Sequence, residues 1–172
     1  MHSISAVKLL AREAGALALS HFKALGSVPV ESKGHLDLVT AADQDVERFL
    51  TEGLVKIFPN DGIFGEEGAA HQGNSGRTWV IDPIDGTFNF VRGGDQWAIS
   101  IGLYESAQPI FGVIFVPLRE QLLVGGVGLQ STLNGELIAQ RSGLDTSRAS
   151  CGVGFHPIIP VDLRLETLRF VI

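Results

Sequence analysis

The chain lacks the features that mark several large classes of protein. It has one cysteine, Cys151, so no disulfide can form within it, as is usual in a reducing compartment. Its 13 basic residues form no cluster, which argues against a nucleic-acid footprint. No apolar run approaches the length that spans a bilayer, and residues 1–15 do not have the pattern of a signal or transit peptide. We therefore expect a cytoplasmic protein that binds neither nucleic acid nor membrane.

The charge balance limits the kind of ligand. The 172 residues are 45% hydrophobic, which is a globular composition with enough apolar side chains for a core. The 19 acidic residues give a net charge of −6. An acidic protein repels phosphate esters, so an anionic substrate would require metal cations to offset the charge.

Hydrophobic periodicity predicts helices in the first third of the chain. Apolar residues follow a helical stripe over 3–24, and a second helix is expected to begin after Thr40 and to end before Pro59. Between them, residues 27–39 alternate loosely, which predicts a short hairpin or a loop.

Short apolar runs predict strands in the rest of the chain. The run 78–81 should be a buried strand that breaks at Asp82-Pro83, and Asn134-Gly135 has the composition of a type I′ hairpin turn. Further strands are expected at 97–104, 110–117, 121–125 and 149–154, with a helix over 161–172. Two helices followed by many strands indicate an α+β fold rather than a βαβ repeat.

The last residues predict that the fold continues. The apolar side chains of Leu165, Leu168 and residues 170–172 bring the chain to its end within an apolar pattern. Domains rarely finish on an exposed apolar stripe. We expect residues 1–172 to be the N-terminal catalytic part of a domain, with 145–172 beginning a second half that is incomplete.

Two carboxylates close together follow the predicted strand in the segment 79–90. Asp82 and Asp85 are three residues apart, and such a pair repels unless a cation lies between its members. Hard oxygen ligands of this kind suit Mg²⁺. Gly86 and Thr87 are expected to begin a short helical turn whose N–H groups suit a phosphate. The alternative is that this segment is only a polar turn.

Carboxylates also occur at two earlier positions. Glu66 and Glu67 lie between glycines, where a solvated loop is the simpler interpretation. Asp43 follows Thr40 with the spacing of a capping box, so it could simply close the start of a helix. Carboxylates are thus expected at the ends of three separate helices or strands. Taken together, they favour a multi-metal phosphoryl-transfer site.

These motifs resemble those of the inositol monophosphatase family. The resemblance rests on DLVTAAD (37–43), GEEG (65–68) and WVIDPIDGTFNFVRG (79–93). It implies a layered αβαβα fold of the inositol-monophosphatase/fructose-bisphosphatase type, a Mg²⁺-dependent hydrolase of small phosphomonoesters, and a homodimer. A later aspartate motif of the family, which completes the second metal site, is absent from this sequence.

The resemblance also implies the metal ligands. By motif position, Glu66 and Asp82 bind a first Mg²⁺ with help from the Ile84 carbonyl, and Asp82 and Asp85 bind a second. Glu67 lies beside the site as support.

The catalytic and phosphate-binding roles follow in the same way. The catalytic residues implied are Asp43 and Thr87, which orient the attacking water, together with Glu66. The substrate and its phosphate contact Gly86, Thr87, Asp85 and Lys33. Lys33 fits equally well as an exposed hairpin lysine.

The substrate remains open among related phosphate esters. We expect an inositol monophosphate or a similar polyol phosphate. The alternatives are a histidinol-phosphate phosphatase, a bisphosphate nucleotidase, or a non-catalytic fragment that binds metal and phosphate.

Overall fold

The computed structural model describes residues 2–25, 33–139 and 160–163, and for residues 33–40 it describes the backbone alone. The chain divides into two compact units, Met1–Ile138 and Ala139–Ile172. In the second unit, residues 161–163 are helical, in agreement with the predicted helix over 161–172 as far as it is described. The predicted strand at 149–154 and the predicted start of a second half at 145 lie outside the described residues. All features below belong to the first unit.

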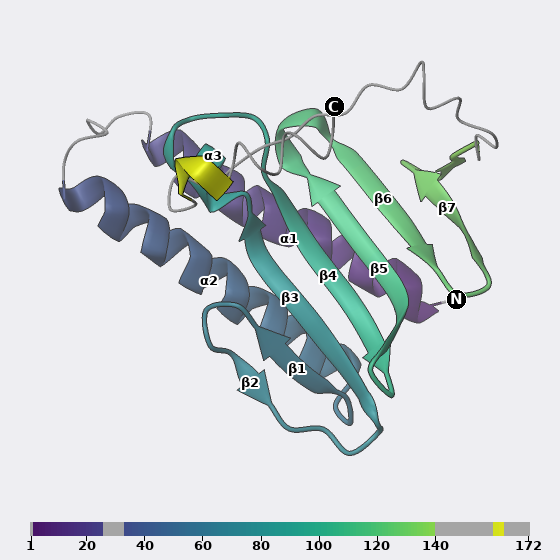
Figure 1. Cartoon of the computed structure of the whole chain (residues 1–172). Coiled ribbons are helices and arrows are strands. Elements are labelled where there is room, and N and C mark those ends of the chain that lie inside the picture. Colours follow the sequence, from purple (N-terminus) through teal and green to yellow (C-terminus); the bar gives the residue numbers. More distant parts are fainter. Residues whose placement is uncertain (1, 26–32, 140–159, 164–172) are drawn as a thin grey trace. The chain divides into compact units, whose positions relative to one another are not determined.

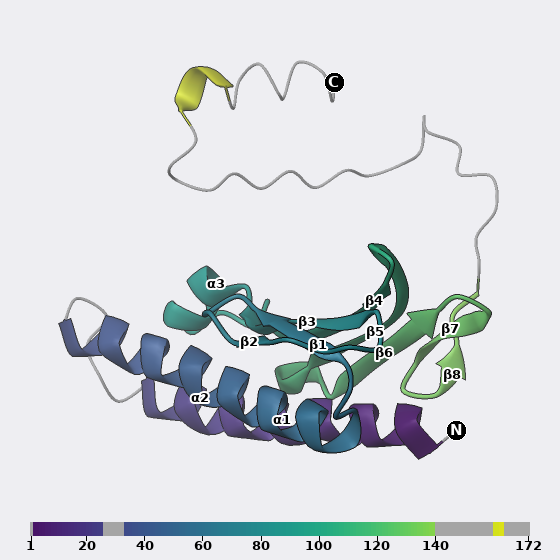
Figure 2. The same cartoon turned by 90° about the horizontal axis from the view of Figure 1, so that it is seen from below.

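Two long helices lie side by side on one face of a sheet (Figures 1 and 2). Helix α1 spans His2–Leu25, which confirms the first predicted helix. Helix α2 spans Lys33–Ile57, so the predicted hairpin or loop over 27–39 is wrong from residue 33 onward. The sequence explains the error, because Leu36 and Leu38 alternate as in a strand, while Leu36 and Val39 continue the three-and-four spacing of α2.

Neither α1 nor α2 contains a stretch that is both long enough and apolar enough to cross a membrane, and the same holds for the rest of the described residues.

One mixed sheet contains all the strands of the first unit that the structure describes. Its order is β2-β1-β3-β4-β5-β6-β7-β8; β1 and β3 run parallel, and the other neighbouring pairs are antiparallel. The strands are β1 Gly62–Gly65, β2 Ala70–His71, β3 Arg77–Asp85, β4 Ala98–Glu105, β5 Gln108–Val116, β6 Gln121–Gly126, β7 Leu129–Leu133 and β8 Glu136–Leu137. The strands predicted at 97–104, 110–117 and 121–125 are confirmed. Asn134 and Gly135 have positive φ between β7 and β8, as the hairpin signal predicts.

The strand β3 runs further than the sequence predicts. It was expected to break at Asp82-Pro83 but continues to Asp85. Its pairing with β4 shifts between Asp82 and Asp85, where β3 contains one extra residue. Such a bulge accommodates Pro83, which has no N–H to donate to the ladder. The carboxylates of this segment therefore stand on a strand end and not on a free turn.

The core lies between the helices and the sheet. Helices α1 and α2 contribute small and aliphatic side chains that are fully or almost fully buried, and the sheet contributes larger ones. The helix residues are Val7, Leu10, Ala11, Ala14, Ala18, Leu25, Ala42, Val46, Leu50 and Leu54; the sheet residues include Trp79, Ile81, Ile99, Ile101, Val113 and Phe115. This packing fixes α2 against β1 and β3.

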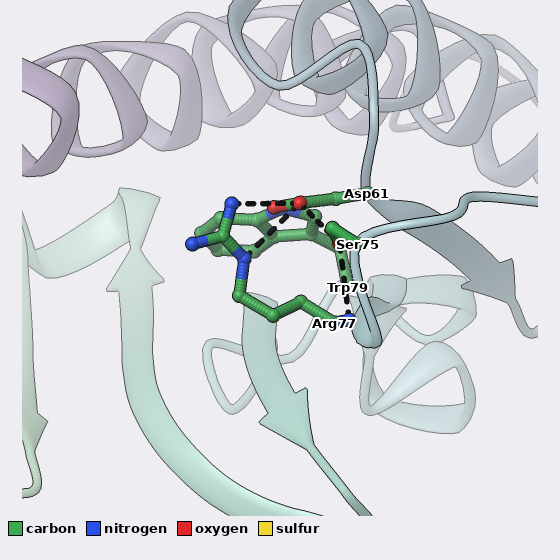
Figure 3. Close-up of polar contacts among 4 residues, drawn as sticks. All are labelled: Asp61, Ser75, Arg77 and Trp79. Atoms are coloured by element: carbon green, nitrogen blue, oxygen red, sulfur yellow. Dashed lines mark hydrogen bonds and ion pairs between the residues drawn. The ribbon is translucent and has the colours of Figure 1, made fainter.

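A buried carboxylate holds the starts of β1 and β3 together (Figure 3). Asp61 is 1% exposed and accepts hydrogen bonds from Ser75 Oγ at 2.7 Å, Arg77 Nη2 at 2.8 Å and Trp79 Nε1 at 3.1 Å. Burial alone raises the pKa of Asp61, but the hydrogen bonds from Arg77, Ser75 and Trp79 and the Arg77 charge lower it below its usual value. The network therefore anchors the parallel strand pair at the end opposite the carboxylates of Asp82 and Asp85.

Candidate active site at the ends of β1 and β3

The parallel pairing of β1 and β3 brings Glu66 and Asp82 together. Gly65 pairs with Ile81, and the Glu66 N–H donates to the Ile81 carbonyl at 3.3 Å. Parallel strands end at the same edge of a sheet, so the next residue of each strand enters the same region. Two motifs that are separated in sequence thus meet at one sheet edge.

The Asp82 side chain is half-buried beside other acids. Its Oδ1 atom is buried and has no hydrogen-bond partner within the described part of the chain. The pKa of Asp82 is raised to about 7, first by burial, then by the charge of Glu66 and a side-chain hydrogen bond with it, and then by the charges of Asp85 and Asp43. Because Asp82 lies within β3, the interpretation of this segment as a simple polar turn is wrong.

Asp43 lies on α2 and faces the same acidic group. Its side chain is 4% exposed. Burial raises the pKa of Asp43 to about 7, with further contributions from Glu67, Glu66 and Glu47. The helix begins at Lys33, so Asp43 lies well inside it and the capping-box interpretation is wrong. A buried carboxylate that closes no helix end requires another role.

Sequence reasoning missed Glu47, one helical turn after Asp43. Its side chain is 5% exposed, and its two carboxylate oxygens accept the backbone N–H groups of Glu67 and Ala69, each at 2.8 Å. A signal was available, because Leu50 and Leu54 follow Glu47 by three and seven residues, the spacing of the buried stripe of α2. Glu47 is therefore identified by its contacts in the folded chain and not by a sequence motif.

A short helix follows β3, as the sequence predicts. Helix α3 spans Thr87–Val91, and Gly86 precedes it with φ 97° and ψ 34°, in the left-handed region. The Thr87 hydroxyl donates to the Ile84 carbonyl at 3.0 Å. On the inner side Phe90 is fully buried, and its ring centroid lies 4.9 Å from that of Trp97. Packing therefore fixes the position of the turn formed by Gly86 and Thr87.

The remaining site residues are less enclosed. Asp85 and Glu66 are exposed at the sheet edge. Lys33 begins α2, and its side chain lies outside the described residues. Among the side chains that are described, no three His, Cys, Asp or Glu residues form a ready-made metal cluster.

The chemistry of these donors nevertheless fits a hard divalent cation. Asp82 has a buried oxygen without a partner, and the Ile84 carbonyl retains a lone pair after accepting the Thr87 hydroxyl. Crowded carboxylates whose pKa values are raised are stabilised in their charged form by a cation. A group of acids of mixed exposure next to a glycine-led helical turn suits a cation and an anion together.

Comparison with known proteins identifies the family. A model of the inositol monophosphatase family matches residues 2–163, so the chain belongs to this family. It is 37% identical over 147 residues to the Nus factor SuhB of Xylella fastidiosa, covering 86% of this chain and 53% of the relative. It is 31% identical over 152 residues to the fructose-1,6-bisphosphatase/inositol-1-monophosphatase of Aquifex aeolicus, covering 88% and 58%.

Solved structures confirm the predicted fold class. Inositol monophosphatase-II from Staphylococcus aureus MSSA476 aligns with a TM-score of 0.66 at 31% identity, covering 80% of this chain and 51% of that one. The α+β, inositol-monophosphatase-like fold expected from the motifs is therefore present. The chain spans about half the length of the relatives it matches.

Proposed function

We propose that the chain contributes the metal-binding half of a Mg²⁺-dependent phosphomonoesterase site. The observation that carries the proposal is the buried, unpartnered Oδ1 of Asp82, placed by strand pairing next to Glu66. A carboxylate oxygen that is withdrawn from water and lacks a donor is stabilised by a metal ion. The family assignment supports the same chemistry.

The proposed cation ligands are Glu66, Asp82, Asp85 and the Ile84 carbonyl. A bound Mg²⁺ would act as a Lewis acid and increase the acidity of a water molecule. Asp85 is exposed and Asp82 is not, so the pair offers one ligand on the open side of the site and one beneath it.

The chain's other residues orient the reactants. The Thr87 hydroxyl proton is directed to the Ile84 carbonyl, so the lone pairs of Oγ1 are available to accept a hydrogen bond from the attacking water. Asp43 is 4% exposed and faces the same acidic group, and we propose that its carboxylate accepts a hydrogen bond from that water and orients it. The N–H groups of Gly86 and Thr87 hold the phosphate, and Lys33 is proposed to lie near it.

The proposed substrate is an inositol monophosphate or a similar polyol phosphate, and the test is a panel of phosphate esters. Phosphate release from inositol monophosphate should require Mg²⁺ and stop when EDTA is added. A clear preference for histidinol phosphate or for a nucleotide bisphosphate would replace the inositol proposal with that substrate. The reaction is proposed to take place in the cytoplasm.

We also propose a homodimer, in line with the resemblance. The exposed apolar side chains of Phe64, Val127 and Leu137 support association. Sedimentation at several protein concentrations tests it, and a monomer at every concentration would contradict it.

A second candidate function is a module that binds metal and phosphate without turnover. It is favoured by one observation, that the later aspartate motif of the family, which completes the second metal site, is absent from residues 1–172. Titration calorimetry separates the two functions, because a binding module takes up Mg²⁺ and phosphate while releasing no phosphate from any ester.

The Gly86→Ala substitution should impair the phosphate-binding turn. A Cβ at Gly86 would lie 2.6 Å from the Gln96 carbonyl oxygen, and φ of +97° is already unfavourable for alanine. We expect at least a tenfold loss of phosphate release, equivalent to about 1.4 kcal/mol or more. Gly93→Ala is the matched control, because Gly93 also has positive φ, +71°, but a Cβ there would have no atom within 4 Å. Equal loss in both variants would show that backbone strain alone, and not the turn's position, causes the effect.

A further inference from the structure

Helix α2 places two buried carboxylates one turn apart, and they have different environments. Asp43 belongs to the acidic group at the sheet edge, whereas Glu47 has both oxygens occupied by backbone N–H groups. Its Oε2 accepts from Glu67 and its Oε1 from Ala69, each at 2.8 Å. The donors lie on the turn that joins β1 to β2, so a helix side chain holds this turn at two points.

The turn is built to fit against this carboxylate. The Gly65 N–H donates to the Ala69 carbonyl at 2.7 Å and closes the turn from the strand side. A Cβ on Gly65 would overlap Oε2 of Glu47, so the absence of a side chain allows the carboxylate to approach. Glu66, the proposed metal ligand, therefore lies on a turn held by its own backbone and by Glu47.

The choice of a carboxylate at position 47 needs an explanation. Glu47 adds negative charge to a region that already contains Asp43, Glu66 and Glu67. It contributes to the raised pKa of Asp43, although less than burial and the other two acids do. A glutamine of the same shape would remove this repulsion. However, an amide has one acceptor oxygen, and its NH₂ group would face the second backbone N–H. In the observed geometry each N–H donates to a different oxygen, so a carboxylate satisfies both donors without any movement and an amide does not.

We propose that Glu47 is a positioning residue that holds the β1–β2 turn so that Glu66 faces Asp82 and can bind the cation. The proposal rests on the proposed function for its metal-binding part. Helix α2 thereby sets the position of Asp43 directly and that of Glu66 through Glu47.

The test compares Glu47→Gln with the unaltered chain and with Glu52→Gln. Glu52 is exposed on the same helix, so it provides the same chemical change away from the turn. Two quantities are measured: the exchange rates of the Glu67 and Ala69 amides without metal, and the Mg²⁺ dissociation constant by titration calorimetry. Circular dichroism reports whether each variant is folded.

In Glu47→Gln we expect faster exchange at Glu67 or Ala69 and Mg²⁺ binding that is at least tenfold weaker, the range for residues that orient metal ligands. Glu52→Gln should match the unaltered chain in both measurements. If Glu47→Gln does not fold, Glu47→Asp decides: it keeps both acceptor oxygens on a shorter side chain, and its Mg²⁺ affinity should also fall.

Three results would overturn the proposal or its basis. Unchanged exchange at both amides would show that Glu47 does not hold the turn. Faster exchange with unchanged Mg²⁺ affinity would make Glu47 structural only. If the unaltered chain binds no Mg²⁺, the proposed function fails, and amide exchange alone then decides whether Glu47 holds the turn.

Discussion

Replacing Asp82 with asparagine is expected to reduce Mg²⁺-dependent phosphate release by about a thousandfold or more, that is by about 4 kcal/mol. The reason is that Asp82 is the least exposed of the three proposed carboxylate ligands and the only ligand assigned to both cations. Activity is measured with the substrate panel, in a longer form of the protein if the 172-residue chain is inactive. Turnover close to that of the unaltered protein would refute the assignment of Asp82.

The same substitution should not destabilise the metal-free protein, which distinguishes it from a folding defect. The pKa of Asp82 is raised to about 7, so the folded state holds this proton more tightly than the unfolded chain. Stability therefore falls as pH rises from the ordinary value near 3.8 toward 7, and at pH 8 the ionised Asp82 opposes folding. Asparagine cannot ionise, so the melting temperature of the Asp82→Asn variant at pH 8 should be no lower than that of the unaltered chain. Asp162→Asn, an exposed aspartate, is the control.

Asp61→Ala should lower the free energy of unfolding more than any other substitution described above. It leaves the Arg77 charge and the Trp79 N–H without their acceptor, and Asp61 itself is 1% exposed. Removing one partner of a buried ion pair costs about 3–5 kcal/mol, and we expect the lower end, about 3 kcal/mol, because the Arg77 side chain is 41% exposed. Urea unfolding at neutral pH measures the change.

Acid should reduce the difference between Asp61→Ala and the unaltered chain. The pKa of Asp61 is lowered in the folded state, so its contribution is complete above the ordinary value of 3.8 and is lost as pH falls through the folded value. Asp95→Ala is the matched control, because Asp95 pairs with Arg119 at 2.8 Å at an exposed position and should contribute little. An equal effect of the two substitutions would contradict the anchoring role of Asp61.

The sequence predicted the fold best where the periodic pattern is long. Helix α1 and strands β4, β5 and β6 were predicted closely, because each presents one continuous apolar face. The start of α2 was not predicted, since Lys33–Thr40 contains too few apolar residues to distinguish the helical period from the strand period. The extent of β3 was underestimated, because a proline next to an aspartate indicates a turn unless a bulge in the pairing accommodates it.

Most residues of the candidate site were predicted by motif, whereas one contact beside it is visible only in the folded chain. Glu66, Asp82 and Asp43 were identified from their neighbours in the sequence, and in the structure Glu66 raises the pKa of both aspartates. Glu47 was not identified, because its partners are backbone N–H groups of Glu67 and Ala69, far from it in the sequence. Backbone donors leave no trace in residue types, so only the folded chain reveals such a contact.

The parallel register of β1 and β3 also determines where insertions and deletions are tolerated. Gly65 must pair with Ile81 for Glu66 to stand next to Asp82, and a slip by one residue would turn the side chains to the opposite face. The connection from β2 to β3 helps to keep this register, because the N–H groups of Asn74 and Ser75 donate to the Asn60 carbonyl at 2.9 and 3.0 Å. A single residue inserted between Gly65 and Glu66 would move Glu66 away from Asp82 while these contacts hold the start of β1 in place. Related sequences should therefore be uniform in length from β1 to Ala69.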